Sequence, residues 1–189
     1  MGSKAGSREA LIDAAEAVVR EKGASHLTLD AVSARAGVSK GGLLYHFRTK
    51  EALILAMVDR MAGFIRSVRN SEGAKLPSSP ARDLKSYVRA FGSGMTDKLG
   101  GTAAAILAAG AENPKLLRSI EETREKGLAR LRCPGMSTAI TEIVFLSLEG
   151  LWILEVLGLR HPTGGERKAI VNELLRLIDR EEAPLKGKA

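Results

Sequence analysis

The stretch Leu27–Leu53, LTLDAVSARAGVSKGGLLYHFRTKEAL, determines the fold of the first part of this chain. Thr28 is a favourable N-cap residue, and Asp30 in the following turn lies at the positive end of a helix dipole. Gly37 lies where that helix should end, at a position that commonly requires a positive φ angle. Ser39 is the next N-cap candidate. The stretch therefore predicts two short helices joined by a tight turn, followed by the start of a third helix.

The second of these short helices has two distinct faces. Leu43, Leu44 and Phe47 would face inward at helical spacing. The outward face would carry Lys40, Gly41, Gly42, Tyr45 and His46. Two adjacent glycines cost roughly 1 kcal/mol each in an ordinary helix. They are explained if a large partner, such as the floor of a DNA major groove, lies against that backbone. We therefore interpret the stretch as a helix-turn-helix DNA reader.

Lys50 gives an independent indication at the start of the next helix. Thr49 would cap this helix, and a lysine in its first turn opposes the helix dipole, which Glu51 only partly offsets. The arrangement is explained if Lys50 and the free amides together hold a DNA phosphate. The alternative is an exposed lysine that is simply tolerated at a helix start.

These residues resemble the DNA-binding domain of the TetR family of bacterial transcriptional repressors. The resemblance runs from about Arg8 to Asp59, and its most specific part is AGVSKGGLLYHFRTKEAL. On this basis we expect the DNA contacts to come from Arg8, Thr28, Ser39, Lys40, Gly41, Gly42, Tyr45, His46 and Lys50.

Two positions depart from the commoner family pattern. Leu44 lies where many members have a tyrosine that contacts phosphate, and Gly42 lies where many have a base-reading threonine. Lys40 and Tyr45 are therefore expected to do more of the reading. Lys40 is the best candidate for a contact to guanine O6 and N7.

The composition agrees with this interpretation. A chain of 189 residues can form one or two domains, and a net charge of +7 favours a polyanionic partner. The sequence has no apolar run of 18 residues or more, so we expect no membrane span. We see no signal peptide, and a single cysteine, Cys133, fits a reducing cytoplasm. We therefore expect a cytoplasmic protein.

The periodicity predicts an all-α protein of about nine helices. Residues 1–48 would form a three-helix DNA-binding domain, and residues 49–189 a helical bundle for effector binding and dimerisation. Residues 70–79 are expected to form a loop, with the next helix capped by Ser79 and starting at Pro80. Thr163 and Glu166 have the spacing of a capping box. The tail from residue 183 is expected to be mobile.

The eighth predicted helix, residues 136–157, is apolar on more than one face. Pairing with the same helix and the ninth helix of a second copy would cover the apolar surface that one chain leaves exposed. Members of the family that the chain resembles dimerise through their last two helices. The alternative is a central helix of a monomeric bundle. The residues assigned to a dimer interface are Leu148, Leu151, Ile170, Leu174 and Leu177. A two-fold dimer would match a palindromic operator.

Regulators of this family hold a small effector inside the C-terminal bundle. The large side chains available to line such a site are Met57, Met61, Phe64, Tyr87, Phe91, Met95 and Trp152. Large apolar side chains at helical spacing also occur in the ordinary hydrophobic core of a protein. The few charges among them favour an apolar or neutral effector.

Nothing in the sequence indicates an enzyme. His26, His46 and His161 have no partner at metal-ligand spacing, so we expect no metal site and no cofactor. Gly41 and Gly42 lack the strand and the lysine spacing of a nucleotide-binding loop. The first hypothesis is a ligand-responsive transcriptional repressor. The alternative is a helical small-molecule-binding or interaction protein that lacks specific operator recognition.

Overall fold

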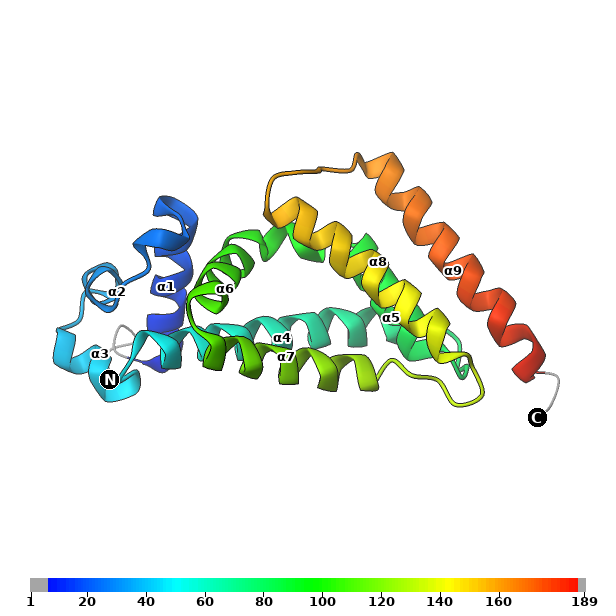
Figure 1. Ribbon diagram of the computed structural model, residues 1–189, viewed down its shortest axis with the longest axis horizontal. Helices are drawn as coiled ribbons and strands as arrows, with labels where there is room; N and C mark the ends of the chain where they lie inside the picture. Colours follow the sequence, from blue (N-terminus) through cyan, green and yellow to red (C-terminus); the bar gives the residue numbers. More distant parts are fainter. Residues whose placement is uncertain (1–6, 187–189) are drawn as a thin grey trace. The chain divides into compact units, whose positions relative to one another are not determined.

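A computed structural model describes residues 7–186 of the chain (Figure 1). This range contains nine α-helices, two short 3-10 helices and no strand. The α-helices are α1 Arg8–Lys22, α2 Leu29–Ala36, α3 Lys40–His46, α4 Lys50–Ala74, α5 Arg82–Gly92, α6 Gly100–Glu112, α7 Pro114–Ala129, α8 Thr138–Val156 and α9 Gly164–Lys186. The 3-10 helices are η2 Ala24–His26 and η3 Met95–Lys98. The predicted fold class is confirmed.

The helices form two compact units. The first unit contains the described residues up to Ala62 together with Leu99–Glu122, and the second contains Gly63–Lys98 and the chain from Thr123 onward. Two helices, α4 and α7, therefore belong partly to each unit. The first unit contains every residue expected to contact DNA.

The core of the first unit is built from α1, α2, α3, the first half of α4 and α6. Its fully buried side chains include Ile12, Val32, Leu43, Leu53 and Met57. Each of these five belongs to an apolar stripe at helical spacing. The core thus places the inward faces of the three reading-domain helices against α4.

The second unit is held by an apolar core and by polar groups buried beside it. Leu84, Val88, Val144, Leu148 and Ile178 are completely or almost completely buried in this core. Burial of side chains of this size stabilises a fold by about 1.5–3 kcal/mol each. The second unit therefore has a core of its own on α5, α8 and α9.

A buried carboxylate joins α5 to α9. Glu182 is completely buried, and its Oε1 accepts a hydrogen bond from the backbone N–H of Ala81 at 2.9 Å. Its Oε2 forms an ion pair of 2.6 Å with Lys85, which also contacts Asp179 at 2.7 Å. Burial lowers the pKa of Lys85, but these carboxylates outweigh it and raise the pKa overall. Glu182 thus caps the start of α5 from a distant part of the chain.

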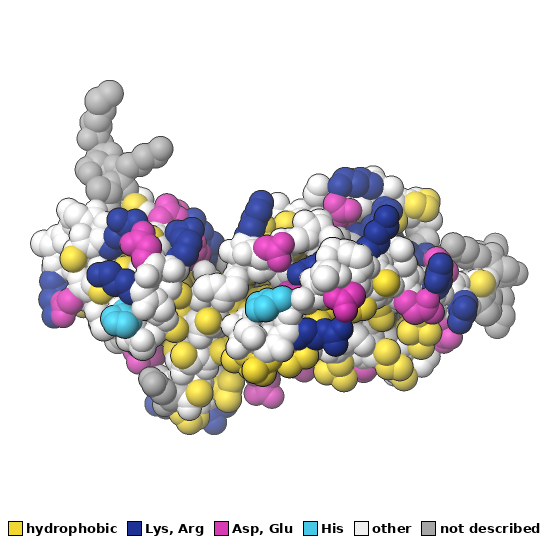
Figure 2. All heavy atoms as spheres, turned by 90° about the horizontal axis from the view of Figure 1, so that it is seen from above, with side chains coloured by type: hydrophobic (Ala, Val, Ile, Leu, Met, Phe, Trp, Pro, Cys, Tyr) yellow, Lys and Arg dark blue, Asp and Glu magenta, His cyan; other side chains and the backbone are white. Residues whose placement is uncertain are grey.

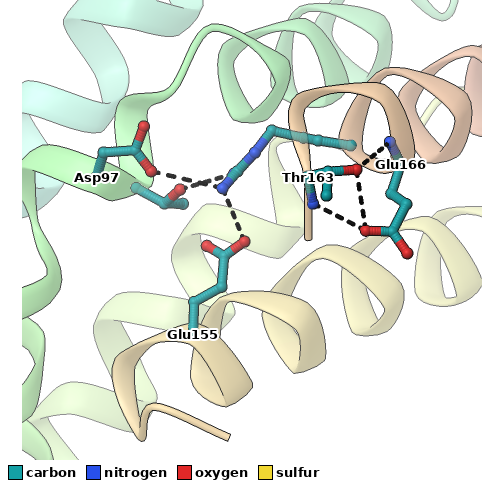
Figure 3. Close-up of polar contacts among 6 residues, drawn as sticks. Asp97, Glu155, Thr163 and Glu166 are labelled. Atoms are coloured by element: carbon teal, nitrogen blue, oxygen red, sulfur yellow. Dashed lines mark hydrogen bonds and ion pairs between the residues drawn. The ribbon is translucent and has the colours of Figure 1, made fainter. Parts of the chain in front are cut away.

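Arg167 on α9 makes a second such junction (Figure 3). Its guanidinium donates to Glu155 on α8 at 2.8 Å and to the Thr96 hydroxyl in η3 at 3.0 Å. It also approaches Asp97 and lies 5.3 Å from the centre of the Phe91 ring. The side chains of Arg167 and Glu155 are only 15% and 10% exposed. This ion pair is therefore largely shielded from water.

The predicted capping box at the start of α9 is confirmed. The Thr163 backbone N–H donates to the Glu166 carboxylate at 2.8 Å, and the Glu166 N–H donates to the Thr163 hydroxyl at 3.2 Å (Figure 3). The hydrogen bonds that the Thr163 backbone N–H and hydroxyl donate to the carboxylate lower the pKa of Glu166. The reciprocal contacts fix the residue at which α9 begins.

The predicted loop at residues 70–79 is wrong in its first half. Helix α4 continues to Ala74, and Gly73 is buried where an added Cβ would lie 3.4 Å from the Cβ of Ser86 on α5. The glycine therefore permits a close approach of two helices and does not mark a loop. The Arg82 guanidinium also donates to the Gly73 carbonyl at 2.9 Å, which satisfies a carbonyl of the last turn.

Three other predicted boundaries are corrected. Helix α5 begins at Arg82, and not at Pro80, because Glu182 fixes Ala81 as its cap. Helix α6 already begins at Gly100, although the glycines at 100 and 101 predict a break before a helix over residues 102–111. Helix α9 extends to Lys186, so residues 183–186 of the predicted mobile tail are helical, while residues 187–189 lie outside the described range.

The ion pair of Arg167 and Glu155 gives a test of this fold. Arg167→Met should lower the free energy of unfolding by about 3 kcal/mol, because Glu155 would remain shielded without its partner. The double variant Arg167→Met/Glu155→Gln should recover part of the loss. Urea unfolding measures both values. Arg176→Met serves as a control, because the Arg176–Glu173 pair is exposed. Equal losses at the two arginines would contradict the proposed role.

Candidate nucleic-acid interface

The candidate site is centred on α3, a helix of only seven residues. Ser39 caps it by accepting a hydrogen bond from the Gly42 backbone N–H at 3.1 Å. Leu43 and Phe47 are buried, whereas Tyr45 is 84% exposed. Leu44, which the sequence placed with the inward residues, is half-buried. The two buried side chains therefore attach the helix to the protein and leave its opposite face free.

The turn before α3 has the predicted geometry. Thr28 caps α2 through a hydrogen bond of 3.1 Å from the Ala31 backbone N–H to its hydroxyl. Gly37 ends α2 in the left-handed region with φ of +68°, where side chains are rarely accommodated. The Val38 N–H then donates to the Ser33 carbonyl at 3.1 Å. These contacts fix the direction in which α3 leaves the turn.

The two glycines of α3 are not required by the packing of the protein itself. Both are exposed and neither has a positive φ angle. An added Cβ at Gly41 would come no closer than 3.9 Å to another group, and one at Gly42 would lie 3.5 Å from the Ser39 hydroxyl. These are ordinary contact distances, so alanine would fit. A partner that approaches the helix backbone from outside would account for the absence of side chains at both positions.

Lys40 at the start of α3 is paired in the free protein. Its ammonium lies 2.9 Å from the carboxylate of Asp30 on α2, and both side chains are more than half exposed. An exposed ion pair of this kind contributes little free energy and is readily exchanged for another partner. Lys40 can therefore move to an acceptor on DNA. The sequence analysis did not identify Asp30 as its partner.

Arg8 connects the start of α1 with the end of α3. Its guanidinium lies 5.5 Å from the centre of the Phe47 ring, and it also makes an exposed contact to Glu9 at 3.4 Å. Tyr45 and His46 pack edge to face, with ring centres 5.0 Å apart. The predicted DNA contacts Arg8, Tyr45 and His46 thus lie on or beside the C-terminal end of α3.

The start of α4 is already partly capped by protein groups. The Ala52 N–H donates to the Thr49 hydroxyl at 3.1 Å. The carboxylate of Glu51 accepts hydrogen bonds from the Glu51 backbone N–H and from the Thr49 side chain, and these lower the pKa of Glu51. Fewer free amides than expected are left for a phosphate. The ammonium of Lys50 remains available, since it makes no ion pair with any residue in the range 7–186.

Sequence reasoning missed one further cation at this end of α3. Arg48 is exposed between α3 and α4, and it has no ion pair in the described chain. The signal was present in the sequence, because Arg48 lies between the predicted contacts His46 and Lys50. We add it to the predicted phosphate contacts.

The side chains expected around an effector are divided between the two units. Met57 is buried in the core of the first unit, and Met61 packs partly buried against the same core. The other five belong to the second unit: Phe64, Tyr87, Phe91, Met95 and Trp152. Tyr87, Phe91 and Met95 are buried there, and Phe64 and Trp152 are half-buried.

The residues expected at a dimer surface are mostly internal. Leu148, Leu151 and Leu174 are at most 9% exposed and pack in the core of the second unit. Ile170 and Leu177 are half-buried. The three leucines therefore stabilise their own chain. The exposed apolar surface of α8 consists instead of Ile143, Leu146 and Leu154, with Leu157 after its end.

The structure shows no feature of a metal or membrane site in the range it describes. No group of three or more histidine, cysteine or acidic side chains there could hold a metal ion. No described helix is both long and apolar enough to cross a membrane.

A capped turn with an exposed, glycine-containing reading helix is typical of a DNA-binding transcriptional regulator. Residues 11–57 match the family of bacterial regulatory proteins called tetR, and residues 81–179 match the tetracyclin repressor-like C-terminal domain. The second match alone spans just over half of the chain. The protein belongs to the TetR family of bacterial regulatory proteins. No curated protein sequence matches the chain.

Solved structures of other proteins have the same fold. A TetR-family protein from Streptomyces coelicolor superimposes with a TM-score of 0.73 at 24% identity, covering 90% of this chain and 96% of the other. The fatty acid degradation regulator FadR from Bacillus halodurans gives 0.65 at 19% identity, covering 89% and 98%. The multidrug binding protein EbrR, in complex with ethidium, gives 0.63 at 27% identity, covering 94% and 99%.

The glycines of α3 lead to a prediction in which stability and DNA binding change in opposite directions. Gly41→Ala and Gly42→Ala should each raise the free energy of unfolding by up to about 1 kcal/mol. Each should weaken operator binding by about tenfold, because the added methyl group separates the helix from the groove. Gly127→Ala in α7 is the control, since a Cβ there meets open space. It should stabilise the protein without changing DNA affinity. Unchanged operator binding by the α3 variants would refute the explanation.

The Lys40–Asp30 pair leads to a second prediction. Lys40→Ala should cost roughly 1–3 kcal/mol of operator binding and relax the preference at one base pair. Asp30→Asn should strengthen binding by up to about fivefold, since the lost surface pair is worth at most ~1 kcal/mol. Binding to a set of single-base operator variants measures both effects. Equal weakening on every sequence by Lys40→Ala would assign Lys40 to a phosphate.

Proposed function

We propose that this protein is a ligand-responsive repressor that binds a palindromic operator as a homodimer. The observation that carries the proposal is the exposed face of α3, which presents Lys40 and Tyr45 beside two glycines that the protein's own packing does not need. Residues 1–48 would read the DNA, and residues 49–189 would dimerise and bind the effector. Its place of action is the cytoplasm, where the operator lies, and no catalytic role is assigned to it.

The dimer surface that we propose is the outer face of α8. Ile143, Leu146 and Leu154 are between 38% and 64% exposed, and they recur at the spacing of one helix face. Ser147 and Gly150 lie between them and are also exposed, so a second helix can approach closely. Figure 2 shows exposed hydrophobic side chains among charged ones on one face of the molecule. A contiguous apolar stripe of this kind is typical of an interface.

A two-fold axis through this surface would set the spacing of the two reading helices. Dimeric helix-turn-helix proteins place their reading helices about 34 Å apart, one turn of DNA, or at multiples of that distance. The helices α8 and α9 of two copies would form a four-helix interface.

The effector is proposed to bind in the second unit. EbrR, which shares the fold, is described as a multidrug binding protein and was solved with ethidium and with malachite green. In this chain, large apolar side chains in the second unit include those of Phe64, Tyr87, Phe91, Met95 and Trp152. An organic molecule with an apolar body would fit such surroundings.

Helix α4 provides the physical link between effector and DNA. It is one continuous helix that begins at Lys50, a proposed phosphate contact, and ends at Ala74 in the second unit. A ligand that binds more tightly to a conformation in which the two reading helices do not have the spacing required by DNA would release the operator. A tenfold loss of operator affinity requires only about 1.4 kcal/mol of differential binding.

The second candidate function is a small-molecule-binding protein that no longer recognises a specific operator. It is favoured by Leu44 and Gly42, which replace side chains that commonly contact DNA in the family. Under this hypothesis DNA binding would be weak and independent of sequence.

Gel-shift titrations with DNA flanking the protein's own gene separate the two candidates. The repressor hypothesis predicts at least 10³-fold tighter binding to one palindromic site than to scrambled DNA at the same salt concentration. Lys50→Ala should reduce the slope of log K against log salt by about one unit, because one fewer counterion is released. Equal binding to scrambled DNA would favour the second candidate.

The dimer surface is tested by a charge on its exposed stripe. Leu146→Glu should convert the dimer to a monomer with little change in the stability of the chain, because an unpaired charge in an apolar interface is costly and Leu146 is 64% exposed. Sedimentation velocity gives the oligomeric state. Leu117→Glu is the matched control, because Leu117 is 52% exposed on α7. A dimer that survives Leu146→Glu would place the interface elsewhere.

A further inference from the structure

Arg69 on α4 is a cation without a carboxylate partner. It is half-buried, and no acidic side chain among the described residues lies within ion-pair distance of it. Its Nε is buried and has no hydrogen-bond acceptor. Burial lowers the pKa of Arg69, but an arginine remains charged at neutral pH. A buried N–H without an acceptor is costly, so its presence on this half-buried cation calls for a functional explanation.

The nearby acidic groups do not compensate this charge. Glu149 on α8 is engaged elsewhere: its Oε1 accepts a hydrogen bond from the Tyr87 hydroxyl at 2.6 Å, and its Oε2, which makes no hydrogen bond, lies in an ion pair 2.5 Å from Arg124. Asp83 acts on Arg69 only from a distance and is exposed. The charges of Arg66 and Arg130 add to the positive potential there. The surroundings of Arg69 are therefore short of negative charge.

A pair of stacked aromatic rings lies beside this cation. The Arg69 guanidinium lies 5.9 Å from the centre of the Tyr87 ring, and Tyr87 stacks on Phe145 at 6.1 Å. Trp152 lies one helical turn after Glu149 on α8, and its buried indole N–H also lacks an acceptor. Phe145 and Trp152 are half-buried, so a ligand can reach them. All of these residues belong to the second unit.

We infer that Arg69 and Trp152 form the polar end of an effector site that takes an organic carboxylate, with its apolar body against Tyr87 and Phe145. This inference rests on the proposed function, because it names the chemical class of the effector. It also replaces the apolar or neutral effector expected from the sequence. That expectation considered only the large apolar side chains and left out Arg69.

A singly charged carboxylate fits this site better than a neutral or a doubly charged ligand. One uncompensated guanidinium balances one negative charge, and its planar fork matches the two oxygens of a carboxylate. A second negative charge would have to leave water without a cation in contact with it, because Arg66 and Arg130 are exposed to solvent. The aromatic neighbours in turn favour a ligand with a substantial apolar part.

Ligand pairs that differ only in charge test the inference. Trp152 is the single tryptophan of the chain, so its fluorescence reports binding directly. Decanoate and 1-decanol are titrated into the full-length protein, its Arg69→Met variant and its Arg66→Met variant. Arg66 is exposed on the same helix and adds to the positive potential there, so its replacement lowers the net charge equally while leaving the proposed ligand contacts in place. Arg69→Met should fold, because it removes an uncompensated charge.

The wild-type protein and Arg66→Met should bind decanoate at least tenfold more tightly than 1-decanol. Arg69→Met should lose this preference by weakening decanoate binding at least tenfold, with 1-decanol binding unchanged. The inference is overturned if decanoate does not bind, if 1-decanol binds equally well to the wild type, or if Arg69→Met retains the preference.

Operator binding measured in the same samples separates this inference from the proposed function. Decanoate that binds through Arg69 without releasing operator DNA would support the carboxylate site and contradict effector control. Release of the operator by 1-decanol, with Arg69→Met behaving as the wild type, would support effector control and overturn the carboxylate site.

Discussion

The burial of Leu43 and Phe47 is the interaction on which DNA reading depends. A helix of seven residues is unstable in isolation, and two glycines weaken it further. Helix α3 is therefore held in place by the two apolar side chains that it inserts into the core of the first unit. Its caps and the turn at Gly37 set its direction. The opposite face carries Tyr45 and Lys40, and it can be adapted to DNA because it contributes little to folding.

The second unit uses polar groups in two different ways. Glu182 and Arg167 are shielded but well paired, and they fix α9 against α5 and α8. Arg69 and the indole of Trp152 are shielded without acceptors. The contrast within one unit is informative, because buried donors in proteins are normally satisfied. The paired groups define the fold, and the unpaired donors define where a ligand of complementary chemistry would stabilise it.

Much of the first unit was predictable, because its signals are local. The caps at Thr28 and Ser39 and the positive φ of Gly37 follow from residue type and spacing within a few positions. The end of α4 and the start of α5 were not predictable. They depend on Gly73 packing against another helix and on Glu182, which lies about a hundred residues away in the chain. Contacts between residues so far apart in the sequence leave no periodic pattern in it. For the same reason, the lack of a carboxylate partner for Arg69 could not be predicted.

The central claim is that α3 enters the major groove, and protection of operator DNA from dimethyl sulfate tests it most directly. This reagent methylates guanine N7 in the major groove and adenine N3 in the minor groove, the edges that distinguish the two grooves. We predict that the protein protects guanine N7 in two half-sites about one helical turn apart, and that adenine N3 between them remains reactive. Protection of adenine N3 alone, with guanine N7 fully reactive, would contradict the account.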